Sequence, residues 1–166
     1  MTAPSTITAA RRAAGILLFL AAAILLASVF AKPVVAASAE VAVGNAWSRA
    51  SIGSTRPGVA YMDIRNEGPG TVVLTGLRTD LATMAEVHRT TTDERGISSM
   101  TPAGEILLEP GKTVALEPGG LHVMLIQLQR AMLEGESFPL SLIFSDGGEV
   151  TIDVPVLGIA AREPED

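Results

Sequence analysis

The sequence predicts an all-β fold, a β-sandwich or barrel of Greek-key type. From residue 40 onward no stretch shows the periodicity of a long amphipathic helix. About eight or nine short runs rich in Val, Ile, Leu and Thr follow one another instead, and Gly or Pro separates them at regular intervals. Two of these runs flank Asp146-Gly147-Gly148, which is a strong hairpin signal.

The first half of this domain supplies five predicted strands, each bounded by turn-forming residues. They cover residues 41–47, 59–65, 72–77, 85–92 and 97–101. Pro57-Gly58 opens the second strand, and the sequence N-E-G-P-G at residues 66–70 ends it. The last two strands are joined by D-E-R-G at residues 93–96 and are expected to pair as a hairpin.

The second half continues the same pattern. Residues 105–108 form either a strand or a short helical turn, and further strands are expected at residues 113–116, 121–128, 137–145 and 150–156. A Pro-Gly or Gly-Gly pair precedes most of them. The sequence therefore predicts one domain over residues 40–159, followed by a flexible polar tail over residues 160–166.

Residues 1–39 have the composition of an export signal. Arg11-Arg12 precedes an apolar run over residues 13–31, and small residues follow at 35–39. This order predicts a signal peptide that is cleaved after Ala39, with Ala37 as the other candidate site. The apolar run is also long enough to span a bilayer, so an uncleaved membrane anchor is the alternative. Either way, the domain is expected outside the cytoplasm, in the periplasm.

Charge and cysteine content exclude several function classes. Without residues 1–39 the chain keeps nine basic and eighteen acidic side chains, a net charge of −9, which argues against nucleic acid or anionic lipid as a partner. The chain has no cysteine. Disulfides, thiolate metal sites and cysteine catalysis are therefore all excluded.

Four side chains form the candidate site. His122 and Met124 are two residues apart in a predicted strand, so their side chains leave the same face. His88 and Met100 flank the predicted turn and fall opposite each other to within one residue if the chain folds back there. Imidazole and thioether groups without a thiolate indicate a soft metal, above all Cu(I).

Each of these residues taken singly has a more ordinary interpretation. A lone methionine on a strand is more often packed in a core, and a lone histidine is more often a hydrogen-bonded residue; only the joint pattern favours metal. Met84 shares strand parity with His88 and is a candidate spare thioether. Glu86 either orients the His88 ring or is simply a solvated strand residue. Trp47 is expected to anchor the core.

No catalytic arrangement is recognisable. Ser98-Ser99 lies near the candidate site, but the sequence contains no nucleophile elbow that would join a serine to a histidine and an acid. No Gly-rich loop follows a strand and opens a helix, so nucleotide binding has no support. The protein is therefore predicted not to be an enzyme.

The spacing H-R-x10-M-x21-H-x-M resembles the pattern of the PCu(A)C family of periplasmic copper chaperones. The resemblance extends to residues 46–50, 60–66, 86–88, 118–125 and 148–150 and so covers the predicted domain. It implies a cupredoxin-like Greek-key β-sandwich that acts as a monomer. The implied ligands of one Cu(I) ion are His88, Met100, His122 and Met124.

The resemblance also implies a function, and this chain departs from the family pattern at one position. The implied function is delivery of Cu(I) to the binuclear copper centre of cytochrome c oxidase, or to another copper chaperone that acts there. Many family members carry methionine directly after the first histidine, where this chain has Arg89. A neighbour in a strand points to the opposite face, so this change should remove no direct ligand.

Of three rival functions, two stay open at the level of sequence. A cupredoxin electron carrier needs the cysteine thiolate of a blue-copper site, and this chain has none. A β-sandwich interaction module with an incidental metal site is the second rival. Copper storage or copper tolerance, without delivery, is the third.

Overall fold

The computed structural model describes residues 37–163, which form ten strands and one short 3-10 helix. In chain order these are η1 Ala37–Glu40, β1 Val41–Arg49, β2 Gly58–Asn66, β3 Val72–Arg78, β4 Ala82–Thr92, β5 Ser98–Pro102, β6 Ile106–Leu108, β7 Thr113–Leu116, β8 Leu121–Leu128, β9 Ser137–Phe144 and β10 Glu149–Leu157. The all-β prediction is confirmed. Residues 105–108, left open between strand and helical turn, contain the strand β6.

The predicted leader and tail lie at the two ends of the chain, most of which the structure does not describe. Most of the predicted leader, residues 1–36, lies outside the described residues, as do residues 164–166 of the predicted tail. Over the described part, no helix has the length and apolar character needed to cross a membrane. The predicted boundary after Ala39 falls inside η1, where the Ser38 amide donates a hydrogen bond of 2.8 Å to the Asp146 carboxylate.

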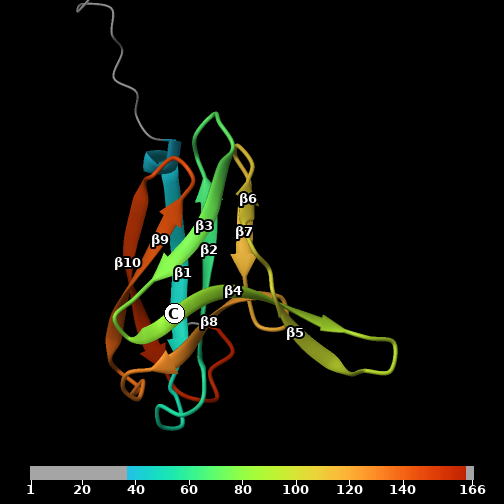
Figure 1. Cartoon of the computed structure of the whole chain (residues 1–166), viewed down its shortest axis with the longest axis vertical. Helices are drawn as coiled ribbons and strands as arrows, with labels where there is room; N and C mark the ends of the chain where they lie inside the picture. Colours follow the sequence, from blue (N-terminus) through green and yellow to red (C-terminus); the bar gives the residue numbers. More distant parts are fainter. Residues whose placement is uncertain (1–36, 164–166) are drawn as a thin grey trace, which may run out of the picture. The chain divides into compact units, whose positions relative to one another are not determined.

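The ten strands belong to one sheet that curls back on itself. Its order is β5-β4-β8-β7-β2-β1-β10-β9-β3-β6, and β8 also pairs directly with β2. A further pairing of β4 with β3, through Leu77 and Ala85, closes the sheet into a barrel (Figure 1). Strands distant in sequence lie side by side, as β1 does with β10 and β4 with β8, so the connections cross the barrel ends as in a Greek key.

Alternating residues fill the interior. In β9 the buried positions are every second residue, with Phe138, Leu140 and Phe144 all at most 2% exposed. Met62 of β2 and Met132 belong to the same core. Burying a side chain of this size contributes about 1.5–3 kcal/mol, and with no cysteine in the chain this core has no disulfide to support it.

One hairpin extends away from the barrel. Figure 1 shows β5 and the end of β4 projecting to the right of the other strands. All five residues of β5 are exposed, whereas the first part of β4 pairs with β8 in the barrel wall. β4 therefore connects the barrel wall to the projecting hairpin, and His88 lies where the one becomes the other.

Candidate metal centre

His88 and His122 lie directly opposite each other on neighbouring strands. His88 of β4 pairs with His122 of β8 in the antiparallel register, so both side chains leave the same face of the sheet. The neighbours Val87 and Val123 point into the core, which places the histidines on the outer face of the barrel. They are nevertheless buried, with exposed fractions of 8% and 3%.

Three ring nitrogens of this pair are buried without a hydrogen-bond partner. They are Nδ1 and Nε2 of His88 and Nε2 of His122. Buried polar atoms in proteins are nearly always paired, so three such atoms on two facing rings need an explanation. A metal ion that accepts one lone pair from each ring accounts for two of these three atoms.

The fourth nitrogen, Nδ1 of His122, has a neighbour that fixes the ring. It lies 3.3 Å from the carbonyl oxygen of Gly120. When Nδ1 carries the proton and donates to this carbonyl, the lone pair of Nε2 is left free for a metal. The turn before β8 holds the carbonyl in place: Gly119 has a φ of +85°, and the Thr90 amide donates a 3.0 Å hydrogen bond to the same Gly120 oxygen.

The ring separation is close to that of two imidazoles on one ion. The ring centroids are 6.2 Å apart and the planes are inclined by 43°. A metal–imidazole bond of about 2 Å puts the ring centre about 3 Å from the ion, so two rings on one ion are separated by at most about 6 Å. The observed distance of 6.2 Å slightly exceeds this limit, so the two rings must move closer together before both can bind one ion.

Both methionines of the predicted set lie on the histidine face. Met124 follows His122 by two residues in β8 and pairs with Glu86 of β4. Met100 lies on β5 opposite Thr90, which shares the face of His88. Met124 is half-buried and Met100 is 55% exposed. All four predicted ligands therefore leave one face of three adjacent strands, and their role as ligands stays a prediction.

The hairpin register differs from the predicted one. His88 pairs with Pro102 and Met100 with Thr90, so Met100 is two residues, not one, from the position opposite His88. The reason is a longer turn: the Asp93 amide donates to the Ile97 carbonyl at 3.0 Å, which adds Ile97 to the predicted loop. Because the offset is even, Met100 keeps the face of His88.

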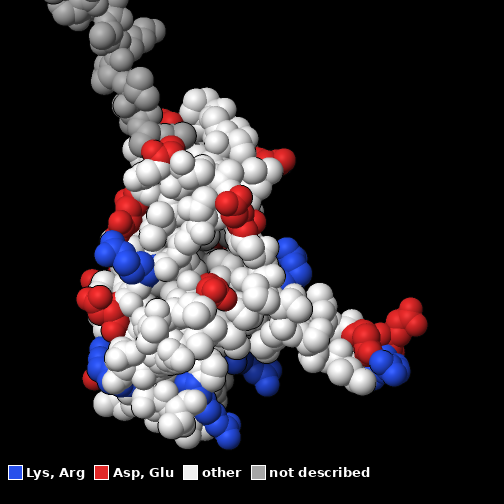
Figure 2. Space-filling view, viewed as in Figure 1, with Lys and Arg blue, Asp and Glu red and all other residues white. Residues whose placement is uncertain are grey.

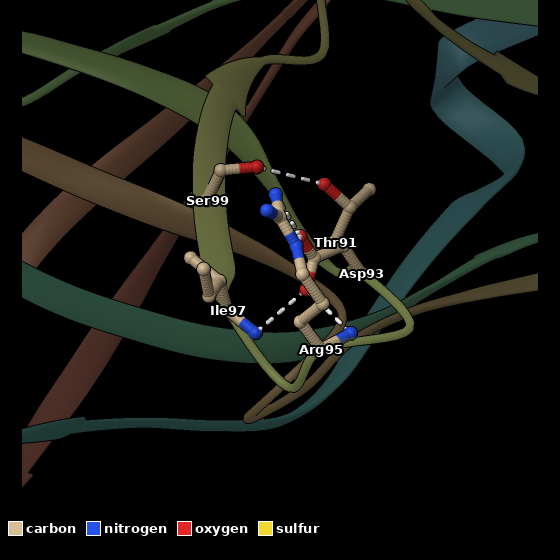
Figure 3. A network of polar contacts seen from close by, with 5 residues as sticks. All are labelled: Thr91, Asp93, Arg95, Ile97 and Ser99. Atoms are coloured by element: carbon tan, nitrogen blue, oxygen red, sulfur yellow. Dashed lines mark hydrogen bonds and ion pairs between the residues drawn. The ribbon is translucent and has the colours of Figure 1, made fainter.

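A network of polar groups holds the tip of this hairpin (Figure 3). The Asp93 carboxylate accepts hydrogen bonds from the amides of Arg95 and Ile97 at 3.0 and 2.8 Å. These bonds, the one from Ile97 foremost, hold the pKa of Asp93 below its ordinary value. Ser99 bonds to Thr91 across the strands, and Ser98 bonds to Thr92 in the same way. The two serines thus support the hairpin that presents Met100.

Two further predicted neighbours of the site share its face. Glu86 lies two residues before His88, and its Oε2 atom is 3.4 Å from His88 Nε2, although the two are not aligned for a hydrogen bond. Met84 lies two residues before Glu86 on β4, opposite Ile126, and is 45% exposed. Arg89 has the opposite strand parity, as expected, and is exposed.

An aromatic cluster that the sequence did not indicate lies on β1 and β2. Trp47 is buried, as predicted, but its partner is Tyr61 at a centroid distance of 4.6 Å, outside the main core cluster. The Arg49 guanidinium lies over both rings, 5.6 and 5.5 Å from their centroids, and donates to the Ala161 carbonyl at 2.6 Å. Burial raises the pKa of the Tyr61 phenol, and Arg49 opposes this shift. Tyr61 is therefore a neutral phenol at neutral pH.

Comparison with protein families gives one match over most of the domain. Residues 41–156 match the family described as "Putative lipoprotein LpqE-like". A curated relative, "Putative lipoprotein Lxx21020" of Leifsonia xyli subsp. xyli (strain CTCB07), is 32% identical over 116 residues. The aligned part covers 70% of this chain and 69% of that relative.

Solved structures with the same fold are PCuAC domains and a related copper protein. The copper-bound PCuAC domain from PmoF2 superimposes with a TM-score of 0.60 at 24% identity, over 72% of this chain and 93% of that domain. The Cu(I) form of DR1885 from Deinococcus radiodurans gives a TM-score of 0.52 at 32% identity, over 69% of this chain and 76% of DR1885. The expected cupredoxin-like fold is therefore confirmed.

Proposed function

Because this chain belongs to the LpqE-like family of PCuAC-type proteins, we propose that it is an exported copper chaperone that binds one Cu(I) ion through His88, Met100, His122 and Met124. The observation that carries the proposal is the facing histidine pair. Its rings are buried, three of its nitrogens have no partner, and both methionines lie on the same face. The names of two matching structures, a copper-bound PCuAC domain and CuI-DR1885, give it further support.

The four proposed ligands suit Cu(I), and their arrangement suits transfer of the ion to another protein. Two imidazoles and two thioethers are neutral, soft donors, and thioethers stay unchanged in an oxidising compartment where thiols form disulfides. His88 and His122 are buried, while Met100 is exposed on a projecting edge strand. An acceptor protein can therefore reach the ion from the Met100 side. Exchange through an intermediate in which donor and acceptor share ligands follows from this arrangement.

The proposed acceptor is the binuclear copper domain of cytochrome c oxidase or another copper chaperone. The protein acts as a binder and carrier, with no catalytic step. On the face drawn in Figure 2, acidic and basic side chains are interspersed, and the basic ones form no continuous stripe. That face offers no surface for a nucleic acid backbone.

The proposed location is outside the cytoplasm. The family and the relative are both described as lipoproteins, and residues 1–39 have the composition of an export signal. The chain has no cysteine and therefore no thiol to which a lipid could be linked. The apolar residues 13–31 are the proposed membrane anchor in case the leader is not cleaved.

Anaerobic Cu(I) titration against a chromophoric chelator tests the proposal. One equivalent should bind, and the double variant His122→Ala, Met124→Ala should lose it. Mixing the loaded protein with a copper-free oxidase domain should then transfer the ion faster than free Cu(I) enters that domain. Unchanged binding in the double variant would remove the proposed site, and binding without transfer would favour storage.

A further inference from the structure

Met84 is an exposed methionine that the proposed ligand set leaves unused, on the face of β4 and β8 that carries the two histidines. Among residues 37–163 only Met84 and Met100 are exposed methionines, at 45% and 55%, and the others there are buried or half-buried. Met84 lies four residues before His88 on β4, and Met100 lies beyond the histidine pair on β5. The pair therefore has one exposed thioether on either side.

The register of β4 and β8 places Met84, Met124 and His122 in a row. Met84 pairs with Ile126 and Met124 pairs with Glu86, so the two methionines are diagonal neighbours on paired strands. Diagonal neighbours lie about 7–8 Å apart, within reach of two long side chains. Met124 is two residues from His122 on β8, a step of about 6.7 Å along the strand. An ion held by Met84 can therefore be bound by Met124 before Met84 releases it, and then by His122 in the same way.

The charge along this row favours a cation. Among the side chains that share this face over residues 84–90 and 122–126, Glu86 alone is charged when the histidines are neutral. Its carboxylate is 42% exposed and lies between Met84 and His88 along β4. A negative charge at this position attracts Cu(I) to the row without any bond between Glu86 and the ion.

We propose that Met84 is the entry ligand of the copper site: it binds incoming Cu(I) first and passes the ion to Met124, from which the ion reaches the histidine pair. The inference rests on the proposed function, which places Cu(I) at that pair. In each transfer the bond to the next donor forms before the bond to the previous donor breaks. The ion stays Cu(I), and no proton moves, because thioethers carry none and the Nε2 lone pair of His122 is free. Met84 is free again once the ion is bound, so it changes the rate of exchange and not the affinity.

Stopped-flow exchange of Cu(I) between the full chain and a chromophoric chelator, under anaerobic conditions, tests this proposal. Met84→Leu keeps the volume of the side chain and removes its sulfur, so loading from the chelator should slow about tenfold or more while the dissociation constant stays unchanged. Release to the same chelator should slow by the same factor, because the ratio of the two rates fixes the equilibrium.

Ile126 supplies both a control and a rescue, because it lies directly opposite Met84 on the same face. Ile126→Leu alters the packing there without adding sulfur and should leave both rates at their wild-type values. Ile126→Met in the Met84→Leu background returns a thioether to the row from the other strand and should restore fast loading. If Met84 acted through packing alone, this relocated sulfur would restore nothing.

Three results would overturn the inference. They are wild-type rates in Met84→Leu, slow loading that Ile126→Met does not restore, and a fall in Cu(I) affinity in Met84→Leu that would make Met84 a ligand of the bound ion. Failure of the proposed function looks different. In that case the wild type binds no Cu(I), or binding survives in the double variant His122→Ala, Met124→Ala, whatever the rates show.

Discussion

His88 and His122 are the residues on which the proposed function depends, because their ring nitrogens are buried. A neutral imidazole that is kept from water and left without a hydrogen-bond partner is costly unless a metal or proton binds it. Three of the four ring nitrogens are in this position, and the fourth faces the Gly120 carbonyl. The site is therefore arranged to make the Nε2 lone pair of His122 available.

At the same scale, the two methionines on β8 and β4 allow a matched test. Met124→Leu removes a thioether from the proposed set but keeps the volume of the side chain, so we expect Cu(I) affinity to fall about tenfold or more and stability to change by less than about 1.5 kcal/mol. Competition with a chromophoric Cu(I) chelator measures the affinity. Met84→Leu is the control, since Met84 shares the face but lies outside the set. Equal effects of the two changes would contradict the assignment.

Sequence reasoning at the residue level succeeded where strand parity decided the outcome. His122 and Met124 share a face and Arg89 leaves the opposite one, both because side chains alternate along a strand. The direct opposition of His88 and His122 was not predictable, because it depends on the pairing of β4 with β8 across 34 residues. The stacking of Trp47, Tyr61 and Arg49 joins β1 and β2 and likewise needs the three-dimensional register.

The β4–β5 hairpin is the element that determines where Met100 lies. Its tip depends on the Asp93 carboxylate, whose hydrogen bonds from Ile97 and Arg95 hold the pKa of Asp93 below its ordinary value. A lowered carboxyl pKa means that the ionised form supports the folded tip. This contribution is fully present above the ordinary value of about 3.8 and is lost as the pH falls through the lower value in the folded hairpin.

The pH dependence gives a local prediction. Protection of the Ile97 amide from hydrogen exchange should be constant above about pH 4 and should decrease below it, and Asp93→Ala should remove the pH dependence and lower the protection throughout. Exchange followed by NMR measures both. Amides of β9 serve as an internal reference because they lie in the barrel wall. If the pH dependence of Ile97 protection persists in Asp93→Ala, a group other than Asp93 causes it, and the prediction fails.

The turn before β8 is the second element that shapes the site. Gly119 has a φ of +85°, a conformation that disfavours any residue with a Cβ atom. Gly119→Ala should therefore destabilise the fold by about 1 kcal/mol, and it should also weaken Cu(I) binding because the Gly120 carbonyl beside His122 Nδ1 is displaced. Urea unfolding and Cu(I) competition measure the two effects. Gly96→Ala, at a φ of +79° in the distant hairpin tip, should cost similar stability with less effect on affinity.

The element-level prediction from sequence was good for strand positions and poorer for loops. Every predicted strand has a counterpart, because Gly and Pro separate the apolar runs clearly. The hairpin loop was wrong by one residue because Ile97 has the composition of a strand residue but accepts the closing hydrogen bond of the turn. Loop closure depends on hydrogen bonds that composition does not encode.

At the scale of the whole molecule, the barrel is held together by its core without any covalent link. The chain contains no cysteine, and the interior is filled by Phe, Leu, Val, Ile and Met side chains. Binding of an ion to the folded state alone therefore adds directly to a stability that otherwise comes from packing. The closure of the barrel through one β3–β4 residue pair was not predictable from sequence.

This linkage predicts a shift in the unfolding temperature. With free Cu(I) at 100 times the dissociation constant, stability should rise by about 2.7 kcal/mol, which corresponds to roughly 10 °C for a domain of this size. Differential scanning calorimetry under anaerobic conditions measures the shift. The variant His122→Ala, Met124→Ala should show no such increase. An equal shift in that variant would place the stabilising copper elsewhere on the chain.

The most direct test of the proposed site is X-ray absorption spectroscopy at the copper edge of the protein loaded anaerobically with one equivalent of Cu(I). Two imidazole nitrogens and two thioether sulfurs should surround the ion, and Met100→Leu and Met124→Leu should each remove one sulfur. A spectrum without sulfur neighbours, or one that neither substitution alters, would contradict the assignment of His88, Met100, His122 and Met124 to a single ion.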